Sequence, residues 1–318
     1  MKRLLGVELT RLRWRRAVLL LLAAAVVVPA LIAVTLIWDS RPPSQVQLDV
    51  ARTNGAAEIA RCEKRPGRFG VSDPERCEEQ IVGWYTHNEP LRLGQERGET
   101  GLAVVAVLTL LVMLAGTTFA GHDWNSGSMS NQLLFEPRRG RVWAAKGLVV
   151  VIGAFVTSAV VSSAYWLALW AVARSRDRPV PDGVLVDCLE FALRGSAFAA
   201  AAALGAYATT MLFRSTVATV GILFAVALAG SILFAAVGVN ERYFPHTNVS
   251  AIVMDGTPYY VQVPERCYTQ ERREPPAEGS ECDQERELSL AEGSLYYGVL
   301  LLGAGTASVM SFRRRDVP

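Results

Sequence analysis

The chain has 318 residues, of which 51% are hydrophobic and only 19% are charged, and its formal net charge is +2. Its mean hydropathy of +0.24 is too apolar for an ordinary soluble protein and indicates a membrane protein. Because positive and negative charges nearly balance, the basic surface that a nucleic-acid-binding protein needs is not expected. The five cysteines and three histidines form no CxxC pair and no HExxH motif, so a metal site has little support.

The chain opens with a basic segment, residues 1–16. Three leucines recur in it at helical spacing, and charged residues occupy another face. The leucines are Leu5, Leu9 and Leu12, and the charged residues are Glu8, Arg11 and Arg15. This pattern predicts an amphipathic helix that lies at the membrane surface and leads into the first span. A basic tail without a helix of its own is the alternative, because so short a segment is marginal as a helix.

Six apolar runs are long enough to cross a bilayer, since a spanning helix needs about 20 mostly apolar residues. They are residues 17–38, 101–121, 148–173, 195–213, 217–239 and 294–312. The first run is too long for a signal peptide, and no small-residue cleavage site follows it. Glu190 and Arg194 stand just before the fourth run and can form an i,i+4 pair in its outer turn. The expected fold class is an all-α membrane protein with six transmembrane helices.

The distribution of basic residues sets the orientation of the spans. Residues 1–16, 122–147, 214–216 and 313–318 together hold 14 basic and 4 acidic residues. The opposite side is acidic, with 17 basic and 25 acidic residues over 39–100, 174–188 and 240–293. We therefore expect both termini in the cytoplasm and the protein in a bacterial cytoplasmic (inner) membrane. Residues 39–100, 174–194 and 240–293 then lie outside.

The two long outer segments, 39–100 and 240–293, each contain one pair of cysteines. The pairs are Cys62 with Cys77 and Cys267 with Cys282, both separated by 15 positions. The equal spacing predicts two local disulfides in an oxidising compartment, each of which staples a segment too small to hold a core alone. Four free thiols, or pairing between the two segments, are the alternatives. Cys188 is left over and is expected to be unpaired.

The chain carries few groups for chemistry. The cores of the six spans hold no Asp, Glu, His or Lys, which disfavours a transporter driven by an ion gradient. Lys146, Glu190, Arg194 and Arg214 stand at span ends, where their charged groups can reach water. No GxxxxGK[ST] phosphate loop and no GxSxG motif occurs, so we expect no enzyme activity and no cofactor, with any ATP hydrolysis on another chain.

The most distinctive stretch is the cytoplasmic loop of residues 122–147. Ser126 can cap a short helix there, and Pro137 ends it. The apolar residues that share one face of this helix are Met129, Leu133 and Leu134. A basic flank before the third span follows, made of Arg138, Arg139, Arg141 and Lys146.

This loop resembles that of the permease subunits of ABC-2-type exporters. In that family it reads approximately acidic, aromatic, x, small, Gly, small, hydrophobic, then Leu-Leu, Pro-x-Arg and Ala-Lys. The matching residues are Asp123, Trp124, Gly127, Ser128, Met129, Leu133, Leu134, Pro137, Arg139, Ala145 and Lys146. The resemblance extends loosely over the whole chain, including the entry helix, the six spans and the inner turn 214–216. Asp123 stands where Glu is commoner, and the outer segments are longer than the family's.

The resemblance implies a permease subunit that forms the translocation path for an unidentified substrate. Its partners would be a second permease subunit, identical or related, two copies of a soluble ATP-binding subunit, and membrane lipid. The implied ATPase-coupling residues are Asp123, Trp124, Gly127, Met129, Leu133, Leu134, Pro137 and Arg139. Of these, Met129, Leu133 and Leu134 are expected to bury an apolar face in the ATPase, with Asp123 and Arg139 at its rim. The alternatives are a membrane protein whose stapled outer segments bind or sense a ligand, and a secondary transporter.

Overall fold

The computed structural model describes residues 2–86, 91–176, 180–264, 267 and 282–314. Within these residues the regular structure is almost entirely helical, and the strands form one two-stranded antiparallel sheet. Six helices are long and apolar enough to cross a membrane. The expected class, an all-α multi-pass membrane protein, is therefore confirmed at this level.

The six long helices coincide with the six expected apolar runs, and most extend beyond them. They are α2 (Arg16–Asp39), α6 (Leu102–Asn125), α8 (Arg139–Ser175), α9 (Val184–Phe213), α10 (Thr216–Ala236) and α12 (Leu290–Arg314). Helix α10, in contrast, ends at Ala236, three residues before its run of 217–239 does. A short helix, α5 (Leu93–Glu96), and a π-helical turn, Arg97–Gly101, lead without a break into α6. Because α9 begins well before residue 195, Glu190 and Arg194 lie inside it and form an i,i+4 ion pair of 3.9 Å.

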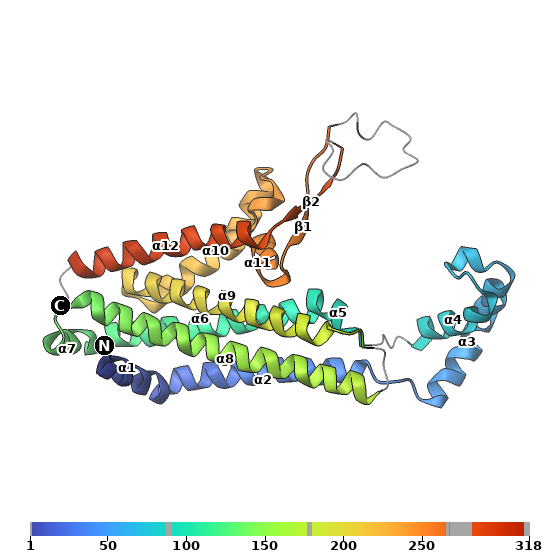
Figure 1. Ribbon diagram of the computed structural model, residues 1–318, viewed down its shortest axis with the longest axis horizontal. Helices are drawn as coiled ribbons and strands as arrows, with labels where there is room; N and C mark the ends of the chain where they lie inside the picture. The colour runs from blue at the N-terminus through green and yellow to red at the C-terminus, as the bar shows by residue number, and fades with distance from the viewer. Residues whose placement is uncertain (1, 87–90, 177–179, 265–266, 268–281, 315–318) are drawn as a thin grey trace.

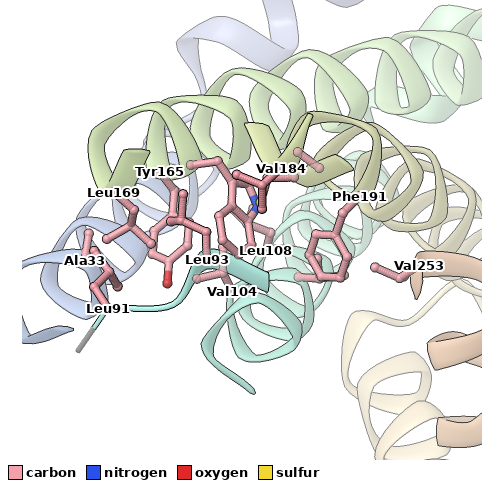
Figure 2. Close-up of a cluster of buried hydrophobic side chains, with 14 of the residues drawn as sticks. Ala33, Leu91, Leu93, Val104, Leu108, Tyr165, Leu169, Val184, Phe191 and Val253 are labelled. Carbon is pink, nitrogen blue, oxygen red and sulfur yellow. The ribbon is translucent and has the colours of Figure 1, made fainter. Parts of the chain in front are cut away.

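The long helices pack as a bundle in which α9 lies against α6 and α8, and α2 lies against α6 and α8 (Figure 1). Figure 2 shows the core at the end of the bundle away from the chain termini. Trp166 meets Tyr165 and Phe191 edge to face, with ring centroids 5.2 and 5.8 Å apart, an arrangement that aromatic rings favour. A Cβ at Gly101 would lie 2.8 Å from the Trp166 ring, so the turn before α6 requires glycine at this position.

Helix α10 is the least buried of the six spans, followed by α12. Its main neighbours are α6 and α9, and it has large exposed apolar side chains along its length, among them Val217, Phe224 and Ile232. A residue at its start nevertheless makes a tight contact, because a Cβ at Gly121 of α6 would fall 1.7 Å from the Thr216 hydroxyl oxygen. Thus α10 is held closely at one end and presents most of its surface to lipid or to another chain.

The two ends of the bundle carry different structures (Figure 1). One end holds both chain termini, α1 (Lys2–Trp14) and the short helix α7 (Ser128–Phe135). The opposite end carries the two cysteine-containing segments. This arrangement is the one that an even number of spans requires.

Each cysteine-containing segment has a fold of its own. In the first, α3 (Gln45–Lys64) and α4 (Cys77–Thr86) form a hairpin around Cys62, Cys77 and Ile81, with 3-10 turns at Pro66–Phe69 and Pro74–Arg76. The second contains α11 (Pro245–Met254), a 3-10 turn at Glu241–Tyr243 before it, and strands β1 (Thr257–Tyr260) and β2 (Glu285–Leu288). Thr257 pairs with Leu288 and Tyr260 with Glu285 across this sheet.

Both expected disulfides are present. Cys62 is bonded to Cys77, and Cys267 is bonded to Cys282, so each bridge is local and the two segments are not cross-linked to each other. Cys188 is a free, buried thiol in α9. The equal spacing therefore identified the pairing correctly.

Candidate functional site

A buried ion cluster joins α1 to the bundle at the end that holds both termini. Lys146 of α8 donates from Nζ to Glu8 Oε2 at 2.7 Å and to Asp123 Oδ2 at 2.5 Å. All three side chains have no exposed surface. One ammonium group therefore bridges a carboxylate of α1 and a carboxylate at the end of α6.

A second cation completes the charge balance of this cluster. The guanidinium of Arg15 bonds the other oxygen of Asp123 and also donates to the Phe119 carbonyl. The Phe119 ring lies between the two cations, with its centroid 4.9 Å from the Arg15 guanidinium carbon and 5.2 Å from Lys146 Nζ. Two fully buried carboxylates thus face two cations, the fully buried Lys146 and Arg15, whose side chain is 16% exposed. Breaking such a pair on one side typically costs about 3–5 kcal/mol, because the remaining charge stays buried.

Polar side chains of α7 tie this helix to the same cluster. Ser128 Oγ donates to Asp123 Oδ1 at 2.6 Å, and Gln132 Nε2 donates to Glu8 Oε1 at 2.5 Å. Arg11 in turn donates to the Gln132 amide oxygen at 3.1 Å. Helices α1, α6, α7 and α8 are therefore connected through one continuous network of hydrogen bonds and ion pairs.

Further contacts fix α8 to the neighbouring spans just beside the cluster. Tyr207 of α9 donates to the Trp143 carbonyl at 2.9 Å, and the Trp143 indole donates to Ser308 of α12 at 3.0 Å. Arg139, the first residue of α8, donates to the Phe312 carbonyl at 3.2 Å. The start of α8 is consequently held by α9 and α12 as well as by α1.

The residues expected to couple the loop to an ATPase divide into buried and exposed sets. Met129 is buried in the core of the chain itself, and Leu133 packs partly against that same core. Leu134 and Phe135 at the end of α7 are instead 80% and 91% exposed. The apolar surface that α7 offers to another molecule is therefore Leu134 and Phe135.

The remaining loop residues shape and hold the turn. Gly127 precedes α7 with a φ of 66°, a left-handed conformation that favours glycine. Trp124 meets the Phe312 ring edge to face with centroids 5.9 Å apart, and the Arg214 guanidinium lies 4.8 Å from the Trp124 ring. Pro137 separates α7 from α8, as its restriction of the preceding residue favours.

Three side chains occupy positions different from those expected. Met129 and Asp123 do not face a partner, because α7 folds back so that both are covered by α1, α6 and α8. Lys146 does not reach water, since two carboxylates inside the protein satisfy its ammonium group. The polar face of α1 that contains Glu8 points inward, so the interfacial helix is held partly by buried charge.

Sequence reasoning missed Glu8, Gln132 and Tyr207 as members of this site. One signal for Glu8 was present: it is the only acidic residue among residues 1–16, which hold six basic ones. A lone carboxylate in so basic a segment is a candidate for an internal ion pair. Nothing in the local pattern pointed to Lys146, 138 positions away, as its partner.

An apolar cavity of about 520 Å³ opens beside the first half of the loosely packed α10, along residues 220–227. It lies between α6, α10 and α11 and is bordered by Thr109, Phe198, Phe224 and His246. The buried hydroxyl of Thr109 has no hydrogen-bond partner among the residues that the structure describes. The wall of the cavity is almost entirely apolar.

Comparisons of this chain with protein-family models, with curated proteins and with solved structures found no match.

Proposed function

We propose that the chain is the permease subunit of an ATP-driven exporter of the ABC-2 type, coupled to a separate ATP-binding subunit. The observation that carries the proposal is the pair Leu134 and Phe135, which stand exposed at the end of a helix that is clamped at its base. In this proposal the end of the bundle with both termini faces the cytoplasm of a bacterial cell, as the basic residues there favour.

The hydrogen bonds and ion pairs at the base of α7 explain how a displacement of α7 is transmitted to the spans. Ser128 and Gln132 connect α7 to Asp123 and Glu8, and these carboxylates share Lys146 of α8. A soft loop would absorb a displacement locally, whereas packed elements with a discrete second arrangement transmit it. When an ATPase bound to Leu134 and Phe135 moves, the network therefore displaces α1, α6 and α8 together.

The loosely packed side of the bundle supports a second permease subunit and a path for substrate. Helix α10 leaves large apolar side chains exposed, and an apolar cavity lies beside it. A second copy or a related chain placed on α10 closes this side and encloses a path between two subunits. The apolar lining suits a mainly apolar substrate.

The decisive experiment changes the exposed tip of α7. Phe135→Asp places a carboxylate where an apolar anchor meets the partner, and losing an anchor at an interface core often costs about 2 kcal/mol or more, roughly a thirtyfold loss of affinity. The soluble ATPase that copurifies with the wild-type permease is quantified, together with its ATP hydrolysis. Val46→Asp on α3 is the matched control, because Val46 is also a largely exposed apolar residue but lies at the opposite end. Undiminished ATPase retention and hydrolysis in Phe135→Asp would contradict the proposal.

The second candidate function is a ligand sensor on the outer side, and one observation favours it. The stapled α3–α4 hairpin borders a polar cleft of about 1140 Å³ that includes Arg52, Glu78, Trp84 and Arg92. Arg52 donates to Glu78 at 2.7 Å, and this carboxylate raises the pKa of the Arg52 guanidinium above its ordinary value. A sensor of this kind requires no ATPase, so the absence of any copurifying ATPase from the wild-type protein would favour it.

A further inference from the structure

A basic pocket of about 320 Å³ lies where the surface helix α1 turns into the first span α2. It is lined by Trp14, Arg15, Arg16, Thr118 and His122 and by the two apolar residues that follow Arg16. None of these lining residues is acidic. The residues that line the pocket are therefore positive or neutral, and the pocket adjoins the ion cluster, with which it shares Arg15.

The polar groups of the pocket are not equally engaged. The guanidinium of Arg15 already has partners inside the protein, because it donates to Asp123 and to the Phe119 carbonyl. Arg16 and His122 are both exposed, and neither side chain has a hydrogen-bond or ion-pair partner within the described residues 2–86, 91–176, 180–264, 267 and 282–314. One unengaged guanidinium and one unengaged imidazole, supplied by α2 and α6, thus border the same cavity.

The backbone at this corner adds to the attraction for an anion. Helix α2 begins at Arg16, and its N-cap Arg15 supplies no side-chain acceptor to the first N–H groups. The first turn of α2 contains no acidic residue. These free N–H groups reinforce the two side chains, since a helix start carries partial positive charge.

The position of the pocket identifies the source of the anion. It lies at the boundary between a helix on the membrane surface and a helix that spans the bilayer, which is the level of the lipid headgroups. Trp14, which lines the pocket, and Leu20, one helical turn after Arg16 in α2, are each 72% exposed. An acyl chain can follow this apolar surface along α2 while the headgroup stays in the pocket, an arrangement that a free phosphate ion does not exploit.

We propose that this pocket binds the phosphodiester headgroup of an anionic phospholipid, with Arg16 and His122 as its principal ligands. Guanidinium groups bind phosphate oxygens through paired, charge-assisted hydrogen bonds, and basic pockets between membrane helices are suited to anionic headgroups. Trp14 packs against the glycerol region of the lipid, where an indole is stable at the interface. The proposal does not depend on any transport activity, so it stands or falls separately from the proposed function.

The test measures retention of phosphatidylglycerol by the purified full-length chain in detergent, with native mass spectrometry as the readout. Phosphatidylcholine with the same acyl chains is the competing lipid. We expect the wild-type protein to retain phosphatidylglycerol preferentially and the double variant Arg16→Gln/His122→Gln to bind it about tenfold or more weakly, the usual effect of losing charged hydrogen bonds. Arg13→Gln is the matched control, because it removes the same charge from exposed Arg13, which does not line the pocket.

A second variant tests the cavity without changing charge. Thr118→Leu fills the pocket from α6, and we expect it to weaken phosphatidylglycerol retention while the thermal unfolding temperature stays close to that of the wild type. Equal losses of lipid in Arg13→Gln and in the double variant would show that only general surface charge matters, which overturns the proposal. Displacement of phosphatidylglycerol by millimolar inorganic phosphate would overturn the assignment to a lipid, because the acyl chain would then contribute nothing.

Discussion

Lys146 and Glu8 lie 138 positions apart in the chain, yet their ammonium and carboxylate groups meet at 2.7 Å with no exposed surface on either side chain. Their contact makes the first helix of the chain part of the bundle core. It also places a positive charge that most membrane helices exclude near the start of α8, where the carboxylates of Glu8 and Asp123 balance it.

Removing the central cation of this cluster should be more damaging than removing one of its carboxylates. Lys146→Met leaves Glu8 and Asp123 buried with less compensation, so we expect a loss of about 3–5 kcal/mol, whereas Glu8→Gln keeps a hydrogen-bonding group and should lose less. Unfolding of the detergent-solubilised protein measures the difference. Arg141→Met, on an exposed residue of the same helix, serves as control. Equal stability of Lys146→Met and this control would show that the cluster does not hold α1.

The close approach of α6 and α10 can be tested by adding one methyl group. Gly121→Ala drives a Cβ into the Thr216 hydroxyl, and overpacking of this kind typically costs about 1–3 kcal/mol. Thr216→Ala should be nearly neutral alone and should partly restore stability in the double variant, because the hydroxyl is gone. A double-mutant cycle on thermal unfolding reports this coupling. Additive effects would mean that the two helices do not touch here.

The first disulfide should stabilise the α3–α4 hairpin without being needed for the spans. Replacing both Cys62 and Cys77 by Ala removes the bridge and part of a small core, so we expect the hairpin to lose about 2–4 kcal/mol. Limited proteolysis should then cut within residues 45–86 while the protein remains inserted in the membrane. Cys188→Ala, which removes a thiol outside any bridge, should leave the cleavage pattern unchanged. Equal resistance of the bridge-free variant would rule out a stapling role.

The orientation can be tested with single reporter thiols. In the described residues the four outer cysteines are bonded and Cys188 is buried, so the background reactivity should be low. We expect a membrane-impermeant maleimide to label Leu134→Cys only in inverted vesicles and Trp84→Cys only in intact cells. Both side chains are exposed in the structure. Labelling of both positions from one side would contradict the six-span arrangement.

The sequence was most informative where the determinants are local. The apolar runs identified all six long helices because about 20 apolar residues leave little choice in a bilayer. Cys62 and Cys77 were paired correctly because a bridge over 15 positions closes within one small segment. These features depend on residues that are close together along the chain.

Which face of α1 packs against the bundle depends on residues far away in the sequence. The burial of Glu8 was therefore not predicted. A helical pattern that separates Leu9 from Glu8 defines two faces but not which of them meets the bundle. Here Glu8 is buried and Leu9 is 55% exposed, because Lys146 offers a buried partner. Met129 was misplaced in the same way, since the local pattern could not show that α7 folds back onto Phe119 and Tyr207.

The contact between Glu8 and Lys146 also sets an order of events during synthesis. A nascent chain that has emerged only as far as α6 already contains Glu8 and Asp123 but lacks the residue that neutralises them both. Before α8 is inserted, Glu8 lacks the buried ammonium of Lys146. We therefore expect α1 to stay at the membrane surface, where water solvates the Glu8 carboxylate. Insertion of the third span is therefore the step at which α1 packs against the bundle, so α1 reaches its final position only after a span that follows it in the chain.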